Sequence, residues 1–271
     1  MGRSIKNTVS RFPILLIVPV LLFSCCEVKE ISSGHFSSPH TDFTELSVEF
    51  LQQIKAGKDT QSIQDRLANT TIKSLKNNLK TDAQRFAFWI NVYNAYILVI
   101  LREHPEYYDD RSDFFSREQI PIVGEKVSFA TIEHGILRRS QWDKGLGYVR
   151  KWFPSKFERN LRVEKKDYRI HFALNCGARD CPPVALYTPE RIEGQFTKGT
   201  ARYLKRTTEY NASQNKVKVT ALFSWFRGDF GGKSGVKKLL ESHDLLPSAK
   251  KVKLHYKNYD WTLDLDNFIE L

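Results

Sequence analysis

The stretch that decides the fold is residues 83–101, which read AQRFAFWINVYNAYILVIL. Thr81 or Asp82 can cap a helix over this stretch, and Pro105 ends it soon after the last apolar residue. Because apolar side chains occur almost all round the helix, we expect it to lie inside the protein. Two asparagines interrupt the apolar run, so we do not predict a membrane span.

Shorter elements flank this helix on both sides. Helical periodicity and capping signals predict helices at residues 43–54, 62–79, 131–139, 188–210 and 235–241. Strand patterns occur at residues 120–129, 168–174, 216–220 and 251–256. We therefore predict one helix-rich α+β domain over residues 42–271, with a small, mostly antiparallel sheet that carries Tyr168–Leu174. By analogy alone, this outline also suits a papain- or transglutaminase-like arrangement.

The N-terminus has the organisation of a secretory signal. Three basic side chains and no acidic ones precede an apolar run at residues 12–23. This run is too short to span the core of a bilayer, which needs roughly 20 apolar residues. The segment Leu22–Cys25, which begins at the end of this run, resembles the lipobox of bacterial lipoproteins, in which the cysteine thiol receives a diacylglyceryl group.

This pattern predicts a signal peptide at residues 1–24, a lipid on Cys25 and a flexible tether at residues 25–41. The alternatives are an ordinary signal peptide that ends near two cysteines, or a lipid on Cys26. We expect the protein in the cell envelope, held by its lipid at the inner or outer membrane and facing the periplasm or the cell surface.

The chain is basic, with a net charge of +11 that falls to +8 without the first 24 residues. Most of the excess positive charge lies between Arg138 and Arg169, a stretch that contains eleven lysines and arginines and four acidic residues. Such a charge favours anionic surfaces such as lipid headgroups or acidic polysaccharide, although a solvated loop region also explains it. The sequence contains no basic, aromatic nucleic-acid module, so we predict no nucleic-acid partner.

Several motifs occur in a fixed order along the chain. They are Phe88–Ala95, Ile132–Arg138, His171–Ala178 with Cys181–Pro183, Phe223–Phe230 and Tyr259–Leu263. In combination they resemble the family known as domain of unknown function 547, over roughly residues 43–265. The resemblance implies a bacterial, often envelope-associated, single-domain protein, and it implies no activity.

One hypothesis for the chemistry is a thiol site. Cys176 is placed where a predicted strand ends in a glycine-containing loop, a position that often presents a nucleophile. With His134 or His171 as base and Asn91 or Asn94 as the orienting group, the set matches a Cys–His–Asn hydrolase or acyltransferase. The alternative is that the histidines belong to the core and that the asparagines bond backbone groups.

Glu133 is a further acid–base candidate beside His134. Neighbours on a helix point about 100° apart, so we do not expect the two to form an acid–base pair by themselves. Arg138 lies one turn after His134, and its charge would disfavour the protonated imidazole if the two are close.

The two cysteines of the domain allow several alternatives. In an oxidising envelope, a Cys176–Cys181 disulfide is the first expectation, ahead of a free nucleophile. A thiol redox pair or a zinc site with His134 and His171 ranks below these, because neither spacing is standard. We predict no metal and no cofactor.

Two functions therefore remain open. The first is an envelope enzyme that acts on amide or ester bonds through Cys176 and the histidines. The second is a non-catalytic envelope lipoprotein for binding or scaffolding, with a structural disulfide. The predicted partners are the membrane, through the N-terminal lipid, and an unidentified peptide, glycan or protein.

Overall fold

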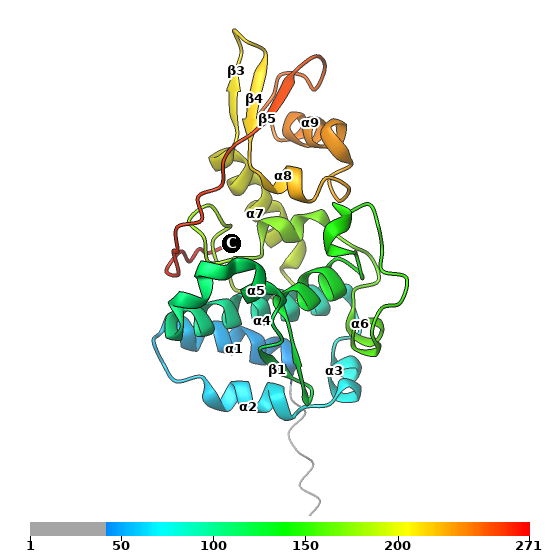
Figure 1. Ribbon diagram of the computed structural model, residues 1–271, viewed down its shortest axis with the longest axis vertical. Helices are drawn as coiled ribbons and strands as arrows, with labels where there is room; N and C mark the ends of the chain where they lie inside the picture. The colour runs from blue at the N-terminus through cyan, green and yellow to red at the C-terminus, as the bar shows by residue number, and fades with distance from the viewer. Residues whose placement is uncertain (1–41) are drawn as a thin grey trace, which may run out of the picture. The chain divides into compact units, whose positions relative to one another are not determined.

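A computed structural model describes residues 42–271, in which one long helix lies among shorter helices and two small sheets complete the domain (Figure 1). The predicted signal peptide, Cys25 and the tether lie outside the described residues. Within the described part, every helix is too short or too polar to cross a bilayer. The prediction of a helix-rich α+β fold is confirmed.

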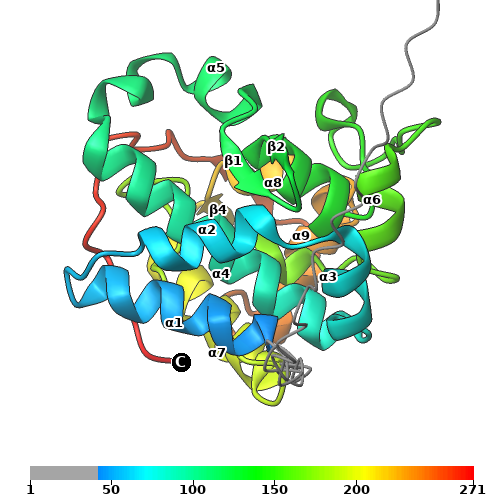
Figure 2. The same ribbon diagram turned by 90° about the horizontal axis from the view of Figure 1, so that it is seen from below.

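The predicted central helix is α4 (Asp82–Glu103), and its middle is buried on all sides. It begins with a capping box, in which Thr81 and Gln84 each accept a hydrogen bond from the other's backbone N–H. Helix α1 (Phe43–Lys55) packs along α4, as both views show (Figures 1 and 2). Each large apolar side chain buried between them contributes about 1.5–3 kcal/mol, which makes this pair the centre of the core.

The other helical elements are short. They are α2 (Gln61–Asn69), α3 (Ile72–Asn78), η1 (Pro105–Asp110), α5 (Arg111–Ser116), η2 (Thr131–Leu137), η3 (Asp143–Gly145), α6 (Lys156–Leu161), η4 (Tyr168–Phe172), α7 (Ile192–Thr207), α8 (Leu222–Trp225) and α9 (Gly232–Ser242). The predicted helix at 62–79 is therefore two helices, separated at Thr70 and Thr71. The predicted helix at 131–139 is the π-helix η2.

Two small sheets complete the fold. Strands β1 (Ile120–Ile122) and β2 (Glu125–Val127) form an antiparallel hairpin, as the turn at Gly124 predicted. The second sheet has the order β3 (Glu209–Asn211), β4 (Lys216–Val219), β5 (Lys253–Tyr256). β3 pairs antiparallel with β4, whereas β5 pairs parallel with it at the edge of the sheet. Together with α8 and α9, this sheet encloses a second apolar cluster.

One prediction about the sheet is wrong. Tyr168–Leu174, the best strand pattern of the sequence, forms the 3₁₀-helix η4 and belongs to neither sheet. Asp167 caps the turn, because its carboxylate accepts a hydrogen bond from the N–H of Arg169 at 2.8 Å. Ile170, His171 and Phe172 are all buried, so the core surrounds this segment instead of lying on one face of it. Tertiary packing thus outweighs the strand preference indicated by the alternation of polar and apolar side chains.

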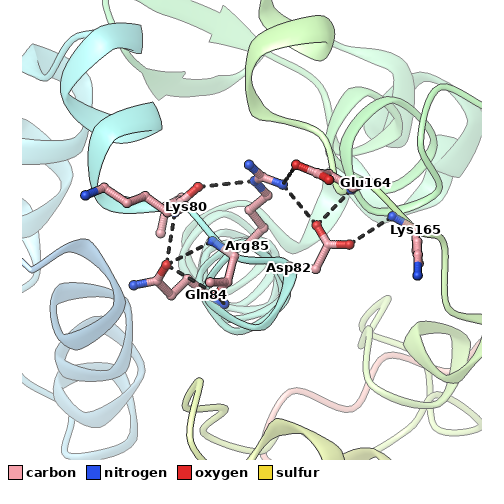
Figure 3. A network of polar contacts seen from close by, with 8 residues as sticks. Lys80, Asp82, Gln84, Arg85, Glu164 and Lys165 are labelled. Carbon is pink, nitrogen blue, oxygen red and sulfur yellow. Dashed lines mark hydrogen bonds and ion pairs between the residues drawn. The ribbon is translucent and has the colours of Figure 1, made fainter.

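The start of α4 also holds a distant part of the chain (Figure 3). The carboxylate of Asp82 accepts hydrogen bonds from the backbone N–H groups of Glu164 and Lys165, at 2.8 and 2.9 Å. Arg85 pairs with the same carboxylate at 3.0 Å, and its Nε donates to the carbonyl of Leu79. The C-terminal part of the basic stretch is therefore fixed to the central helix.

Candidate functional site

A cavity of about 210 Å³ lies where η2, η4 and the aromatic segments near α8 and after β5 meet. We call it the aromatic cavity. Its ring-bearing walls are Tyr93, Phe115, Trp225, Phe226, Tyr259 and Trp261. Glu133, His134, His171 and Cys176 also reach it. It therefore brings together the predicted base candidates and Cys176, but neither predicted asparagine.

The π-helix η2 explains how neighbouring side chains reach one wall. Its wide turn is closed by a hydrogen bond from the N–H of Arg138 to the carbonyl of Glu133, five residues earlier, at 2.8 Å. Single π-helical turns inside helices are rare and occur often at functional sites. In this turn, Glu133 Oε1 lies 3.9 Å from His134 Nδ1. This distance is longer than a hydrogen bond, so the two neighbours do not form an acid–base pair by themselves, as expected.

The hydrogen bonds of His134 define its tautomer. Its Nδ1 lies 2.5 Å from Nη1 of Arg138, and a guanidinium can only donate. Nδ1 therefore accepts, and the proton of the neutral ring is on Nε2. Burial and the charge of Arg138 lower the pKa of His134 to about 3, so the ring is neutral at ordinary pH. Nε2 has no partner among the described residues and is available to a ligand.

Asp229 is the centre of a buried charge network behind this wall. Its carboxylate accepts from Arg138 Nε at 2.6 Å, from His171 Nε2 at 2.9 Å and from Lys166 Nζ at 2.9 Å. Burial opposes ionisation, but the bond from His171 and the charge of Arg138 hold the pKa of Asp229 well below its usual range. The network is therefore ionic, although its acid is only 3% exposed.

His171 is neutral for a related reason. Burial lowers its pKa to about 4, and the hydrogen bond to Asp229 only partly offsets this. Its Nε2–H donates to Asp229, so Nδ1 carries the free lone pair. The ring stacks on Phe226 at 3.9 Å between centroids, which fixes its orientation in the cavity wall.

Glu133 differs from the other polar side chains of the cavity. Its carboxyl group makes no hydrogen bond with the described residues, and its side chain is 16% exposed. Burial raises the pKa of Glu133 to about 7, a shift that Arg138 reduces and Asp229 increases. The group can therefore exchange a proton near neutral pH, as a general acid or base must.

The sulfur of Cys176 is joined to Cys181 in a disulfide, with the two Cα atoms 6.0 Å apart. The hydroxyl of Tyr259 lies 3.7 Å from Cys176 Sγ and 3.2 Å from Cys181 Sγ. Within residues 42–271, no histidine nitrogen hydrogen-bonds to Cys176. In this state Cys176 carries no nucleophilic thiolate, and the sulfurs are not free for the zinc or thiol alternatives.

The two asparagines of α4 bond backbone groups. Asn94 accepts from the N–H of Asn175 at 2.8 Å and donates to the carbonyl of Ala173 at 3.0 Å. Asn91 binds both backbone groups of Tyr187 in the same way, at 2.9 and 2.8 Å. They lie on one face of α4, as their spacing predicted, but they hold a loop against the helix and do not orient an imidazole. The predicted Cys–His–Asn set is not assembled.

Asp229 is the main residue that sequence reasoning did not select. It follows Gly228 inside the Phe223–Phe230 motif. An acidic residue within such an aromatic segment is the one feature of the sequence that could have indicated a functional role for Asp229. Gly228 is required there, since a Cβ atom would lie 2.4 Å from the carbonyl carbon of Gly147. This close approach brings the loop around Gly147 against Asp229.

Comparison with known proteins supports part of the family resemblance. The family model described as "Protein of unknown function, DUF547" matches residues 77–204. The matched segment contains α4, η2, η4 and both cysteines of the disulfide, whereas Asp229 and Tyr259 lie beyond it. No curated protein and no solved structure matches the chain.

Proposed function

We propose that this domain is a cell-envelope enzyme that hydrolyses an amide or ester bond of a small, uncharged compound in the aromatic cavity. One observation carries the proposal: Glu133 and His134 lie in the same cavity wall. Burial raises the pKa of the Glu133 carboxyl group to about 7, and the neutral imidazole of His134 offers an N–H. A general base works best when its pKa lies near the ambient pH. A neutral imidazole held in one tautomer can polarise a carbonyl group.

In the proposed reaction, the carboxylate of Glu133 takes a proton from a water molecule. The water oxygen attacks the carbonyl carbon, and Nε2–H of His134 donates to the carbonyl oxygen as it gains negative charge. The bond to the leaving nitrogen or oxygen then breaks, and the proton held by Glu133 passes to that atom. Nδ1 of His171 accepts a hydrogen bond from the substrate and positions it.

The charges around the cavity support an uncharged substrate. Arg138 and Lys166 are both paired with Asp229, so neither offers a free positive charge to an anion. The cavity of about 210 Å³ holds only a small group, and its walls are mainly aromatic. Because Cys176 is held in the disulfide, its thiol is not free to attack the substrate. We therefore assign the role of nucleophile to a water molecule activated by Glu133.

The proposed envelope location rests on the sequence of residues 1–25. A disulfide between Cys176 and Cys181 agrees with an oxidising compartment. Mass spectrometry of the N-terminus of the protein purified from cells tests it directly. We expect a chain that begins at Cys25 and carries the mass of acyl groups, and an unmodified N-terminus elsewhere would contradict the proposal.

The catalytic proposal is tested with a panel of small chromogenic esters and anilides. Glu133→Gln keeps the shape of the side chain and removes the base, so hydrolysis should fall by about 10²–10⁴-fold. The matched control is Glu106→Gln, which alters an exposed carboxyl outside the cavity and should leave the rate unchanged. In the parent protein, the rate should rise with pH through about 7 as Glu133 ionises.

A thiol mechanism predicts the opposite pattern. If Cys176→Ser abolished hydrolysis while Glu133→Gln did not, the proposal would be wrong and the thiol hypothesis would be restored. We expect a Cys176→Ser/Cys181→Ser double variant to remain active under conditions in which it is folded.

A second function, binding without catalysis, is favoured by the aromatic wall. Trp225 and Trp261 stack at 5.5 Å with an angle of 24° between their planes, and Tyr259 packs against both. Such surfaces bind planar or sugar-like ligands through their faces. Saturable quenching of tryptophan fluorescence by a ligand, with no turnover in the parent protein, would support binding and exclude the enzyme.

A further inference from the structure

The chain between η2 and α6 exposes large apolar side chains to solvent. Trp152 and Phe153 are 86% and 91% exposed, and Tyr148 is 63% exposed. Trp142, Leu146 and Val149 add to the same segment, with 41–45% of each side chain exposed. Soluble domains seldom expose a large apolar surface unless another surface covers it. We call residues 142–153 the docking loop.

The docking loop has a defined backbone. Trp142 N–H donates to the carbonyl of Val149 at 2.9 Å, and Lys151 N–H donates to that of Ser140 at 2.8 Å. At its tip, Gly147 has a φ of +84°, and a Cβ atom there would lie 2.9 Å from the backbone nitrogen of Asp229. These contacts fix the loop to the domain, so its aromatic side chains are held outward.

Exposed basic side chains occur in the same part of the chain as the aromatic groups. Exposed lysines and arginines in and after the loop are Lys144, Arg150, Lys156, Arg159 and Lys165, whereas Lys166 is paired with Asp229. Only Asp143 and Glu164 are exposed acids in residues 142–166. The docking loop lies beside α6 on one flank of the domain (Figures 1 and 2). The flank therefore carries both exposed apolar side chains and an excess of exposed positive charges.

This combination matches the chemistry of an anionic membrane surface. Tryptophan and other aromatic rings favour the boundary between headgroups and acyl chains. Lysine and arginine near that boundary attract anionic headgroups, each by roughly fivefold in affinity. A protein partner of acidic surface would meet the charges but would leave Trp152 and Phe153 without an apolar environment.

We propose that the docking loop binds the surface of an anionic phospholipid membrane, with Trp152 and Phe153 inserted at the boundary between headgroups and acyl chains. This contact is separate from the lipid expected on Cys25 and from the chemistry of the aromatic cavity. It would hold the domain against the membrane in one orientation.

The test uses the full chain as purified from cells, mixed with vesicles of phosphatidylglycerol and phosphatidylcholine whose acyl chains carry bromine. Bromine quenches only tryptophans that enter the acyl region. We expect clear quenching, and Trp152→Phe should remove most of it. Trp225→Phe is the matched control and should leave the quenched signal unchanged, because Trp225 lines the aromatic cavity. Far-UV circular dichroism verifies that both variants are folded.

Charge is tested in the same assay. An Arg150→Gln/Lys156→Gln variant should reduce quenching on anionic vesicles, with a binding midpoint shifted by roughly tenfold or more. Lys58→Gln/Lys238→Gln removes two charges from other surfaces and should shift it little. Equal quenching on vesicles of phosphatidylcholine alone would overturn the requirement for anionic lipid.

Two further results would overturn the docking itself. One is that the protein binds the vesicles and is quenched, but the Trp152→Phe variant shows the same quenching. The other is protection of Trp152 from acrylamide on membranes without any quenching by brominated lipid, which would indicate a protein on this surface instead.

Discussion

Two buried polar clusters of this molecule differ in how completely their atoms are paired. On α4, Asn91 and Asn94 bond backbone groups at both ends of each amide and are fully buried. Around the aromatic cavity, the carboxyl group of Glu133 has no hydrogen bond among the described residues. Nη2 of Arg138 is also buried without a partner in the described part of the chain.

The difference separates structure from chemistry. Buried polar groups that serve the fold are nearly always satisfied, because an unpaired one costs about 1–3 kcal/mol. A group left unpaired next to a cavity keeps its capacity for a ligand or a proton. On this criterion, the asparagine cluster is structural, and the cavity cluster is the part of the molecule to which we assign the proposed function.

The largest expected effect comes from the centre of the cavity network. Asp229→Asn removes the charge that compensates Arg138, which is only 2% exposed. Leaving one partner of a buried ion pair uncompensated costs about 3–5 kcal/mol of unfolding free energy. Urea denaturation measures this loss, and Asp143→Asn, at an exposed site, should change stability by less than about 0.5 kcal/mol. Similar values for both variants would contradict an ionic network.

The second prediction concerns the pH dependence of stability. The pKa of Glu133 is raised to about 7 by burial, so the folded protein binds a proton that the unfolded chain releases near pH 4.5. The stability that this proton provides is complete below pH 4.5 and is lost as the pH rises through 7.

Glu133→Gln cannot ionise, so it should be more stable than the parent protein above pH 7, by about 3 kcal/mol. The difference in unfolding free energy between the two proteins should shrink as the pH falls toward 4.5. Thermal or urea unfolding from pH 4.5 to 8 measures the difference. A constant difference across this range would show that Glu133 ionises normally and would remove the basis for its role as a base.

The third prediction tests the structural cluster. Asn94→Ala leaves the N–H of Asn175 and the carbonyl of Ala173 buried without partners, at a cost of about 1–3 kcal/mol for each group. Asn258→Ala, at an exposed site, is the matched control. Under conditions in which the Asn94→Ala variant is folded, its rate of substrate hydrolysis and its affinity for ligands of the aromatic cavity should equal those of the parent protein. A loss of activity without a loss of stability would return Asn94 to the catalytic set.

The smallest effect is expected at the disulfide, which lies between the two clusters. The loop that it closes spans Cys176 to Cys181, and so short a loop stabilises the fold by about 2 kcal/mol. Urea denaturation of the Cys176→Ser/Cys181→Ser variant measures this value. Alkylation of the unreduced protein provides a second test, because two freely reacting domain thiols would contradict the disulfide.

Much of the fold was predictable because its signals are local. The cap at Thr81, the apolar run of α4 and the turn at Gly124 each act over a few residues, and all appear in the structure as expected. Tyr168–Leu174 failed because alternation indicates a strand only when one face is buried, and here the core lies on several sides. The π-helical turn of η2 has no comparable local signal.

The candidate site was predictable only in part. His134, His171, Glu133 and Cys176 were selected from residue type and position, and they do meet in one cavity. Their roles were not predictable, because each role depends on a partner. Arg138 and Asp229 are 91 positions apart in sequence, and no periodicity relates them.

The sequence by itself determined the α+β class, the buried central helix, the basic stretch and the division of its cysteines between the N-terminus and the domain. Local propensity, periodicity and charge are properties of short segments, and they can be read without the fold. Only the tertiary structure decided that the asparagines bind backbone, that His134 is neutral and that Glu133 has a raised pKa. Those properties depend on burial and on distant partners, which only the folded chain supplies.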